Sequence, residues 1–430
     1  MNRIALFALA GLLTACGSSA GKTDSATLSK RIEADSSLQI VKDKALEIVK
    51  SGFNAGDGYS EVWIRDYNTF ITVATKVHPH ELIKKQLLTF FRLQGEDGNI
   101  ADGFVTKASL KGKPSDYYTI TNALAPQFAA HKNTVETDQE TSLIQAVHKY
   151  IKATNDTSFL ETKVGTTTVK ERMEHAMDFL MKHRYNEKYG LLWGATTADW
   201  GDVQPEHDWG VHLDENSHLA IDIYDNAMFL IALDNYMDMI PAAANRWKLI
   251  REQIAGSTMQ HLWDDKNQKF IPHIYLTTSP FDKNFDENQI YYHGGTAVAI
   301  EANLLSKEQI KTSLDKMIAN VKASGAATIG LTLYPTYPEG SFKNKGMYPY
   351  GYQNGGDWTW FGGRMIQQLI KNGFEKEAYE QLKPMLDRVI VNKGFFEWYT
   401  KDNKPKGSGT FRGEAGVLYD AIVLLEHAQK

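Results

Sequence analysis

The chain has 430 residues, 42% of them hydrophobic and 23% charged, which is ordinary for a globular protein of one large domain or two medium ones. A formal net charge of -5 and a pI near 6.2 provide no basic excess of the kind that binds nucleic acid, and no nucleic-acid partner is expected. The 9 Trp and 20 Tyr suit flat, polar ligands as well as a core.

Residues 1–15 are predicted to be a signal peptide. Arg3 supplies a basic start, and the apolar run from Ile4 to Leu13 is too short to span a bilayer. Leu13-Thr14-Ala15-Cys16 resembles the bacterial lipoprotein box, which implies cleavage before Cys16 and lipidation of its thiol. We therefore expect an exported protein held on a bacterial membrane, on the periplasmic or outer-membrane side, by its lipid anchor alone. The competing interpretation is a buried apolar helix.

Residues 16–36 are predicted to be a flexible linker after the lipidated cysteine, because Ser, Gly, Lys and Thr dominate the start of this segment. Cys16 is the only cysteine, so lipidation would leave no thiol for a disulfide or a cysteine nucleophile. No Pro- or Ser-rich linker divides the rest, and residues 37–430 are predicted to form a single domain.

Helical periodicity recurs throughout that domain. Twelve helices are predicted, at 37–51, 66–77, 79–93, 137–153, 168–184, 216–239, 241–263, 295–304, 306–323, 357–371, 373–390 and 413–428. Capping boxes predict three of the starts, at Thr137–Glu140, Thr168–Glu171 and Ser306–Gln309. Pro79 and Pro241 stand where a first helical residue should be.

Six helical pairs in one all-α domain predict an (α/α)6 toroid whose inner helices surround a central cavity. A two-layer helical solenoid is the alternative, but it would show a sequence repeat, and none is found. Loops longer than about a dozen residues in a compact domain are usually functional. The long connections are 52–65, 94–136, 186–215, 264–294, 324–356 and 391–412.

Three of these connections carry carboxylates beside Trp or Arg. In the first, Trp63 and Arg65 offer a stacking face and a hydrogen-bonding fork for a sugar, while Asp66 has the alternative role of a helix N-cap. The second holds Asp199 and Asp202 in a segment with three tryptophans, Trp193, Trp200 and Trp209. A solvated acidic loop does not need those tryptophans. A metal is an alternative ligand for the segment, but no H-E-x-x-H spacing appears and no metal is expected.

The third connection places Glu397 between Phe396 and Trp398, with an ion pair to a nearby Lys or Arg as the alternative role. Glycoside hydrolysis needs a protonated carboxyl for the leaving oxygen and an ionised one for water or direct attack. Asp199 and Glu397 are predicted to fill these roles, with Asp202 as the alternative acid. The sequence has no G-x-S-x-G elbow, phosphate loop or dinucleotide fingerprint, and no cofactor is implied.

These motifs together resemble the (α/α)6-barrel glycoside hydrolases, which include glucoamylases, trehalases, processing α-glucosidases, neutral invertases and debranching-type glucosidases. Trp63-Ile64-Arg65-Asp66 is similar to the glucoamylase motif whose Arg and Asp hold hydroxyls of the terminal sugar. Asp199-Trp200 is similar to the general-acid segment of invertases. Phe396-Glu397-Trp398-Tyr399, with the later Arg412–Gly416, looks like the segment that presents the general base.

The segment from Tyr352 to Trp358 is similar to the Tyr-His-Asn-Gly-x-x-Trp segment of invertases and debranching-type enzymes, with Gln353 and Thr359 as departures from the His and Pro usual there. Its glycines are expected to let the backbone approach a ligand, whereas Gly362 and Gly363 are expected to allow close helix packing. The predicted substrate-binding residues are Trp63, Arg65, Asp66, Trp200, Asp202, Tyr352, Asn354, Asp357, Trp358, Trp360 and Glu414.

The resemblance implies an exo-acting, inverting glycosidase, expected to be a monomer, that releases a terminal sugar from an oligo- or polysaccharide, with an α-glucosidic substrate as the best expectation. One alternative is a glycan-binding lipoprotein without catalysis. Others on the same barrel are a phosphorylase, which needs a basic phosphate pocket, and an epimerase, which needs paired histidines. The candidates for such a pair are His207, His212, His218 and His293. A uronic-acid lyase, using Tyr or His, is a further alternative.

Overall fold

The helices of the chain alternate between an outer and an inner layer. The computed structural model describes residues 20–110 and 117–429. The inner helices are α3 (Ile64–Val77), α5 (Asp138–Thr154), α7 (Ile223–Met239), α9 (His293–Glu301), α11 (Thr359–Lys371) and α13 (Arg412–Ala428). The outer helices are α2 (Ser36–Lys50), α4 (His80–Leu93), α6 (Val169–His183), α8 (Ala244–His261), α10 (Lys307–Ser324) and α12 (Glu375–Asn392). All twelve predicted helices are therefore present.

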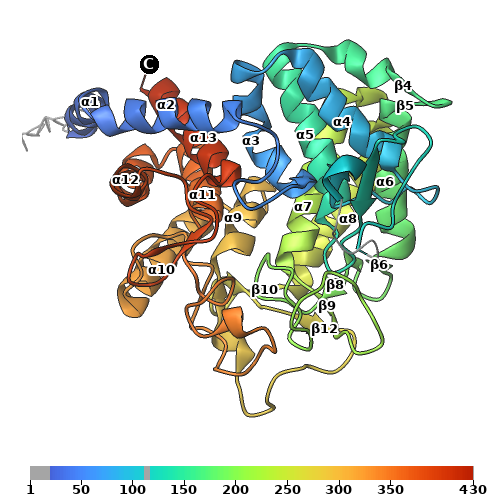
Figure 1. The fold of residues 1–430 in the computed structure, drawn as a ribbon. Helices are drawn as coiled ribbons and strands as arrows, with labels where there is room; N and C mark the ends of the chain where they lie inside the picture. Colours follow the sequence, from blue (N-terminus) through green and yellow to red (C-terminus); the bar gives the residue numbers. More distant parts are fainter. Residues whose placement is uncertain (1–19, 111–116, 430) are drawn as a thin grey trace, which may run out of the picture.

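The six inner helices form a closed ring. Each packs against the next, from α3 through α5, α7, α9 and α11 to α13, and α13 packs back against α3 (Figure 1). This closure confirms the predicted (α/α)6 toroid and excludes the open solenoid. Because each outer helix returns the chain, all six inner helices begin at the same end of the ring.

Burial differs between the two layers. Every residue of α3 from Ile64 to Ile71 is buried, since this helix packs against α5 and α13 within the ring and against α2 and α4 outside it. The outer helix α2 buries one face only, with Leu38, Val41 and Ala45 on it. Most of the hydrophobic core is one cluster of buried side chains that extends from Ile32 to Leu425, and two smaller clusters are separate from it.

Glycines set the close approach of some helices. A Cβ on Gly416 would lie 2.4 Å from the Thr69 carbonyl oxygen, so glycine permits the contact of α13 with α3. A Cβ on Gly362 would meet Met385 at 2.6 Å, and one on Gly363 would meet Val417 at 2.7 Å. The prediction that these two glycines serve helix packing is confirmed.

Two of the three predicted capping boxes are present, Thr168 with Glu171 and Ser306 with Gln309. The box predicted at Thr137 is wrong, since this side chain makes no cap hydrogen bond. Glu140 instead accepts a 2.8 Å hydrogen bond from the Ile100 backbone N–H and a 2.6 Å bond from Lys132. The predicted helix at 216–239 begins only at Ile223, because residues 219–221 form a strand.

The strands are short and lie in the connections between helices. The two three-stranded sheets are β1 (Val62–Trp63), β2 (Gly103–Thr106) and β3 (Phe128–His131), and β12 (Ile274–Tyr275), β9 (Leu219–Ile221) and β8 (Gly194–Ala195). The remaining pairs are β4 (Lys163–Val164) with β5 (Thr167–Thr168), β6 (Tyr185–Asn186) with β7 (Leu191–Leu192), β10 (Trp263–Asp264) with β11 (Lys269–Phe270), β13 (Tyr291–Tyr292) with β14 (Leu333–Tyr334), and β15 (Trp398–Tyr399) with β16 (Pro405–Lys406), all antiparallel.

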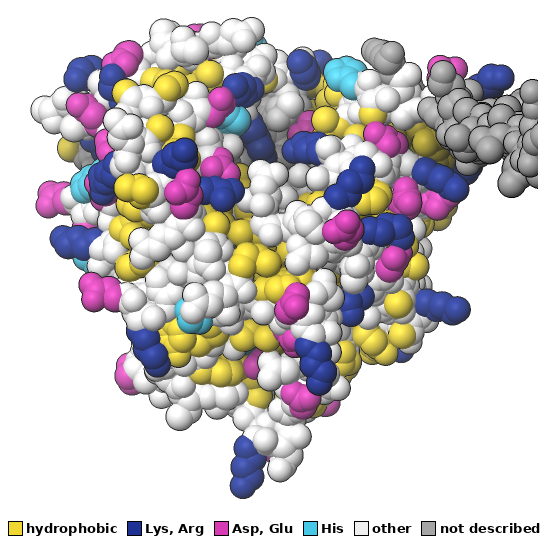
Figure 2. All heavy atoms as spheres, turned by 180° about the vertical axis from the view of Figure 1, so that it is seen from behind, with side chains coloured by type: hydrophobic (Ala, Val, Ile, Leu, Met, Phe, Trp, Pro, Cys, Tyr) yellow, Lys and Arg dark blue, Asp and Glu magenta, His cyan; other side chains and the backbone are white. Residues whose placement is uncertain are grey.

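The N-terminal predictions meet the structure only in part. The signal peptide and the lipidation of Cys16 lie outside the described residues. Much of the predicted flexible linker is the helix α1 (Ala20–Glu33), so that part of the prediction is wrong. Within the described ranges, no helix has the length and apolar character needed to cross a membrane. Figure 2 shows charged side chains of both signs scattered over one face of the protein.

Candidate active site

A cavity of about 450 Å³ opens at the end of the toroid where the inner helices begin. The site residues predicted from the sequence that line it are Trp63, Arg65, Asp66, Trp200, Asp202, Tyr352, Trp358, Trp360 and Glu397. The lining residues that were not in that prediction are Tyr59, Asp102, Tyr117, Trp209, Val211, Gln353, Trp398, Gly407 and Phe411. Segments far apart in the sequence therefore meet around one space.

The first turn of α3 supplies Arg65 and Asp66. The residue that caps α3 is Trp63, and it makes no side-chain cap bond, so Asp66 lies in the first turn and faces the cavity rather than serving as the N-cap. Asp66 is 6% exposed, and burial raises its pKa well above the usual value, against the lowering effect of Arg65. The N-terminal end of a helix favours such a carboxylate.

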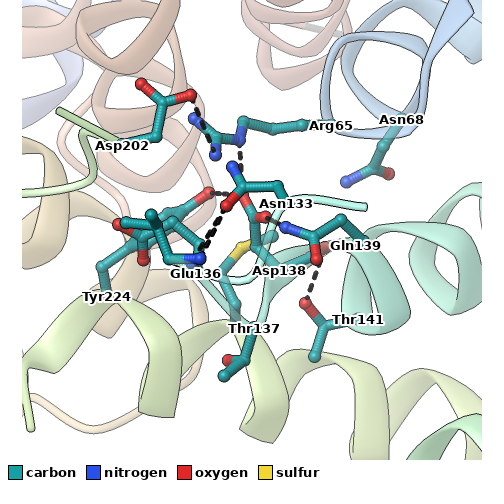
Figure 3. Close-up of polar contacts among 12 residues, drawn as sticks. Arg65, Asn68, Asn133, Glu136, Thr137, Asp138, Gln139, Thr141, Asp202 and Tyr224 are labelled. Atoms are coloured by element: carbon teal, nitrogen blue, oxygen red, sulfur yellow. Dashed lines mark hydrogen bonds and ion pairs between the residues drawn. The ribbon is translucent and has the colours of Figure 1, made fainter. Parts of the chain in front are cut away.

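Arg65 is held by a buried polar network beneath the cavity (Figure 3). Its Nε lies 2.5 Å from Oδ2 of Asp138, which is fully buried at the start of α5. Asp138 also accepts hydrogen bonds from the Tyr224 hydroxyl at 2.7 Å and from Gln139 Nε2 at 2.8 Å. The other end of the guanidinium, Nη2, lies 4.0 Å from Oδ2 of Asp202. A planar fork with fixed partners keeps one orientation, so Arg65 presents a defined edge to the cavity.

Asp202 faces the cavity, with 28% of its side chain exposed. Its Oδ1 accepts a 3.2 Å hydrogen bond from Gln353 Nε2. Gln353, which stands where the related families usually have His, therefore contacts Asp202, one of the two candidates for the general acid. Asp202 is free to reach a bound sugar and is oriented by Arg65 and Gln353 from two sides.

Asp199, the preferred acid in the sequence analysis, does not line the cavity. It is fully buried, and its two carboxylate oxygens each accept a 2.7 Å hydrogen bond, from the backbone N–H groups of Gly294 and Gly295. A Cβ on either glycine would lie within 3 Å of that carboxylate, at 2.9 and 2.8 Å, which explains the glycine pair. Burial raises the pKa of Asp199 and these two donors lower it. The prediction that Asp199 is the general acid is therefore corrected. Its carboxylate accepts hydrogen bonds from backbone N–H groups in the first turn of α9, which have no partner within the helix.

Glu397 lines the same cavity and lies just before β15. Its Oε2 accepts hydrogen bonds from the Tyr59 hydroxyl at 2.6 Å and from the Ser408 backbone N–H at 3.2 Å. Both bonds fall on Oε2, so within the described chain Oε1 remains for a ligand. Burial raises the pKa of Glu397, and the two donors oppose that rise. Glycine at position 407 lets the backbone lie close to the Glu397 carboxylate, since a Cβ there would be 2.3 Å from Oε2.

The segment from Tyr352 to Trp360 is partly cavity wall and partly internal structure. Tyr352, Trp358 and Trp360 line the cavity. Asn354 does not, because its side chain is fully buried and bonds the backbone of Tyr337 and Met347. Its assignment as a substrate contact is therefore wrong.

Asp357 is also away from the cavity. It is 1% exposed, and its Oδ1 lies 2.9 Å from Arg388 Nη2, while Thr328 donates to both of its oxygens. The glycines of this segment serve turns rather than a ligand, since the Gly356 N–H bonds the Tyr352 carbonyl and Gly355 has φ +88. Asp357 thus joins α11 to α12 and is not a substrate contact.

Glu414 is the fourth predicted residue that the cavity excludes. It lies in the first turn of α13 and is fully buried, with Arg388 and Thr359 close enough to lower its pKa. Burial raises its pKa to about 8. Four residues that were predicted to belong to the site do not line the cavity, because their side chains point elsewhere: Asp199, Asn354, Asp357 and Glu414.

The base of the cavity is aromatic. Trp200 stacks on Phe361 at 4.2 Å with an interplanar angle of 14°, and it meets Trp358 and Trp360 edge-on at 4.9 and 5.5 Å. Trp360 is fixed by a hydrogen bond from Nε1 to the Thr69 hydroxyl, at 2.9 Å. Interlocked rings of this kind form a rigid floor against which a sugar face can pack.

Asp102 is a cavity carboxylate that sequence analysis missed. It precedes β2, whose pairing with β1 brings it beside Arg65. Burial raises the pKa of Asp102 to about 7, and the nearby Arg65 lowers it. Its neighbours Ala101 and Gly103 are not aromatic, so no Trp or Arg beside it marked the position.

The described carboxylates close enough to share a cation are not those of the acidic segment. They are Glu136, Asp222 and Asp225, whose candidate ligand atoms lie within 4.8 Å of one another. All three are buried and none lines the cavity. Of the four candidate histidines, none lines the cavity either, and His293 is buried with its Nε2 3.1 Å from Asn320.

Comparisons with known proteins bear on this arrangement. Residues 118–401, more than half of the chain, match the family described as amylo-alpha-1,6-glucosidase. No curated protein matches the sequence. Among solved structures, an uncharacterised conserved protein from Thermus thermophilus superposes with a TM-score of 0.62 and 12% identity, over 88% of this chain and 99% of that one.

Two further structures are of named hydrolases. The GH63 mannosylglycerate hydrolase of Thermus thermophilus, in complex with glucose, has a TM-score of 0.61, 14% identity and coverage of 88% of this chain and 99% of that chain. A rhamnosidase from Klebsiella oxytoca with rhamnose bound has a TM-score of 0.57, 12% identity and coverage of 90% and 63%. At such identities these structures establish the shared fold, and the match over residues 118–401 establishes the family: the chain belongs to the amylo-α-1,6-glucosidase family of glycoside hydrolases.

Proposed function

We propose that the protein is an exo-acting, inverting glycosidase that releases a terminal α-glucosyl unit, with Asp202 as general acid and Glu397 as general base. The observation that carries this is that Asp202 and Glu397 line one cavity together with Trp63, Arg65 and Asp66. The family description, amylo-alpha-1,6-glucosidase, supports the sugar and the anomer.

Asp202 has the accessibility that an acid catalyst needs. Its protonated carboxyl would donate to the glycosidic oxygen as the bond from that oxygen to C1 breaks, so that the leaving group departs as a neutral alcohol. Arg65 and Gln353 fix the orientation of the side chain from two sides. Asp199 cannot do this, because both of its oxygens are occupied by backbone N–H groups.

Glu397 has a free oxygen for the opposite step. Oε1 would accept a proton from water as the water oxygen bonds to C1, while Tyr59 and Ser408 stabilise the charge on Oε2. An inverting enzyme needs about 6.5–9.5 Å between its carboxyl groups to admit that water. The product anomer, followed by ¹H NMR during the first turnovers, tests this step: inversion is expected, and retention would make Glu397 a nucleophile.

The floor of the cavity favours exo action. Trp200, Trp358 and Trp360 are each at most 4% exposed and close its base, so a chain end can enter while a continuous polymer cannot pass through. Trp63, Arg65 and Asp66 line this space and would hold the ring and hydroxyls of the terminal sugar.

The alternatives have weaker support. A phosphorylase needs free cations, yet the cation among the cavity-lining residues is Arg65, which is paired with Asp138. An epimerase needs paired histidines, and none lines this cavity. A uronic-acid lyase would not require two carboxylates in one cavity, as Asp202 and Glu397 are here. A binding protein without catalysis would bind sugar equally well without Glu397.

The cellular location is part of the proposal. The segment Leu13-Thr14-Ala15-Cys16 supports export and a lipid anchor on a bacterial membrane, and a monomer is proposed. Cys16→Ala should move the protein from the membrane fraction to the soluble fraction. Unchanged fractionation would contradict the lipid anchor without bearing on catalysis.

The activity is tested by incubating the wild-type protein with maltose, isomaltose, trehalose and sucrose and measuring released monosaccharide by ion chromatography. Glucose release from at least one α-glucoside is expected. Sugar binding without release would contradict the proposal and favour the binding protein.

A further inference from the structure

A second, smaller pocket opens beside the candidate acid. Its volume is about 110 Å³, against about 450 Å³ for the main cavity. Asp202, Trp209, Val211 and Tyr352 line both spaces. The smaller one continues to Val203, Gln204, His207 and Gly210. Asp202 therefore lies at the junction of two adjoining pockets.

This position has a chemical consequence that rests on the proposed function. The glycosidic oxygen that Asp202 protonates separates the sugar to be released from the leaving group. Glu397, Arg65 and Asp66 lie only in the main cavity, so the reacting sugar occupies that space. We infer that the pocket lined by Trp209 and His207 is the leaving-group subsite, and that it takes a compact, hydroxyl-bearing group of one sugar ring or less.

Trp209 is suited to packing against such a group. Its side chain is 69% exposed, an unusual position for so large a hydrophobic residue, and it lies edge-on to Tyr352 at 6.4 Å. The tryptophans of the cavity floor are, by contrast, nearly buried. An aromatic face at the pocket mouth gains contact area when a sugar or polyol covers it.

His207 supplies the polar side of the subsite. Its Nε2 is buried and has no hydrogen-bond partner, although Asp214 Oδ1 lies 3.4 Å away. The neighbouring Gln204 already has a partner at each side-chain polar atom, since its Nε2 donates to the His212 carbonyl and its Oε1 accepts from the Ser217 hydroxyl. The His207 side chain is 21% exposed and lines the pocket, so a hydroxyl of the leaving group would meet the accessible edge of the ring rather than Nε2, which faces Asp214.

The size of the pocket limits what it admits. It has about a quarter of the volume of the main cavity, and its inner wall is formed by Val203 and Gln204, both buried. A long or branched leaving group would extend past Trp209 into solvent and gain little contact. Short glycosides are therefore expected to be better substrates than polymers.

The test compares two substrates that share the reacting sugar: α-D-glucosyl fluoride, whose leaving group is a single atom, and the best-cleaved disaccharide of the α-glucoside panel. Trp209→Ala should lower kcat/KM for the disaccharide about tenfold relative to the fluoride, the size expected for a lost aromatic contact. His207→Ala should act in the same direction. Leu249→Ala, an equally exposed hydrophobic residue on α8, should change neither.

Equal losses for the two substrates in Trp209→Ala, or no loss in either, would overturn the inference. So would a wild-type kcat/KM that rises from the disaccharide to longer oligosaccharides of the same linkage. Failure of the wild-type protein to cleave α-D-glucosyl fluoride would instead contradict the proposed glucosidase itself, which keeps the two failures apart.

Discussion

The Tyr59 hydroxyl donates a 2.6 Å hydrogen bond to Oε2 of Glu397, across a sequence separation of 338 residues. The bond favours the ionised carboxylate, which a general base requires, and it opposes the burial that raises the pKa of Glu397. Tyr59, in the first long connection between helices, thereby lowers the pKa of Glu397, in the last one.

Tyr59→Phe should raise the pKa of Glu397 further, because it removes a donor to the charged form. The acidic limb of the pH profile of kcat/KM should then move to higher pH, and the rate at low pH should fall about tenfold. Tyr117→Phe is the matched control, since this tyrosine lines the same cavity and makes no hydrogen bond to Glu397. If the acidic limb of the kcat/KM profile does not move in Tyr59→Phe, the hydrogen bond from Tyr59 does not set the pKa of Glu397.

Asp202→Asn and Asp199→Asn should fail in different ways. The first removes the proton donor and should lower kcat for disaccharides by roughly 10²–10⁴-fold, while α-D-glucosyl fluoride, which needs no proton, stays a substrate. The second leaves one buried N–H of Gly294 or Gly295 without a partner and should cost about 1–3 kcal/mol of unfolding free energy. Substrate-dependent kinetics and urea unfolding separate the two. The reverse pattern would restore Asp199 as the acid.

Asp138→Asn should weaken both stability and substrate binding. It breaks a buried pair in which Arg65 Nε lies 2.5 Å from Asp138, and this costs about 3–5 kcal/mol of unfolding free energy. KM should rise because Arg65 loses its fixed orientation. Asp238→Asn is the control, as this exposed carboxylate pairs with Lys152 at 2.8 Å and should change stability by about 1 kcal/mol or less. Similar losses in both variants would contradict the special position of Asp138.

Glu414 should make stability depend on pH. Its pKa is raised by burial from 4.5 to about 8, so the unfolded state loses this proton first as pH rises. The group therefore costs no stability below about pH 4 and progressively more between about pH 4.5 and 8, up to about 4 kcal/mol. Glu414→Gln should match the wild type at pH 4 and exceed its unfolding free energy at pH 8, in denaturant titrations at the two pH values. A variant less stable at pH 8 would imply an ionised Glu414 with partners.

Much of the fold could be predicted because the helices have local causes. Periodic apolar residues predicted all twelve barrel helices, and the hydroxyl–carboxylate and hydroxyl–amide pairs at Thr168 and Ser306 fixed two starts. The capping box predicted at Thr137 is absent because Glu140 accepts hydrogen bonds from Ile100 and Lys132, which lie outside the helix. The predicted linker carried no strong apolar pattern, and α1 was missed.

The site was predicted less completely, because composition does not tell which way a side chain points. Asp202 and Asp199 lie three positions apart beside the same Trp200, yet one faces the cavity and the other bonds the start of α9. Asp357 likewise pairs with Arg388, a residue with no local sequence link to it. Asp102 reaches the cavity through strand pairing and Tyr59 through the course of its loop. Neither position can be predicted from the spacing of residues in the sequence.

The most direct test of the account is glucose release by wild type, Glu397→Gln and the surface control Glu339→Gln on the best-cleaved α-glucoside. Glu397→Gln should lose about 10³-fold or more in kcat while it still binds the sugar and keeps the wild-type unfolding midpoint, and Glu339→Gln should equal the wild type. A Glu397→Gln rate within tenfold of the wild type would contradict the claim that Glu397 and Asp202 act together in this cavity.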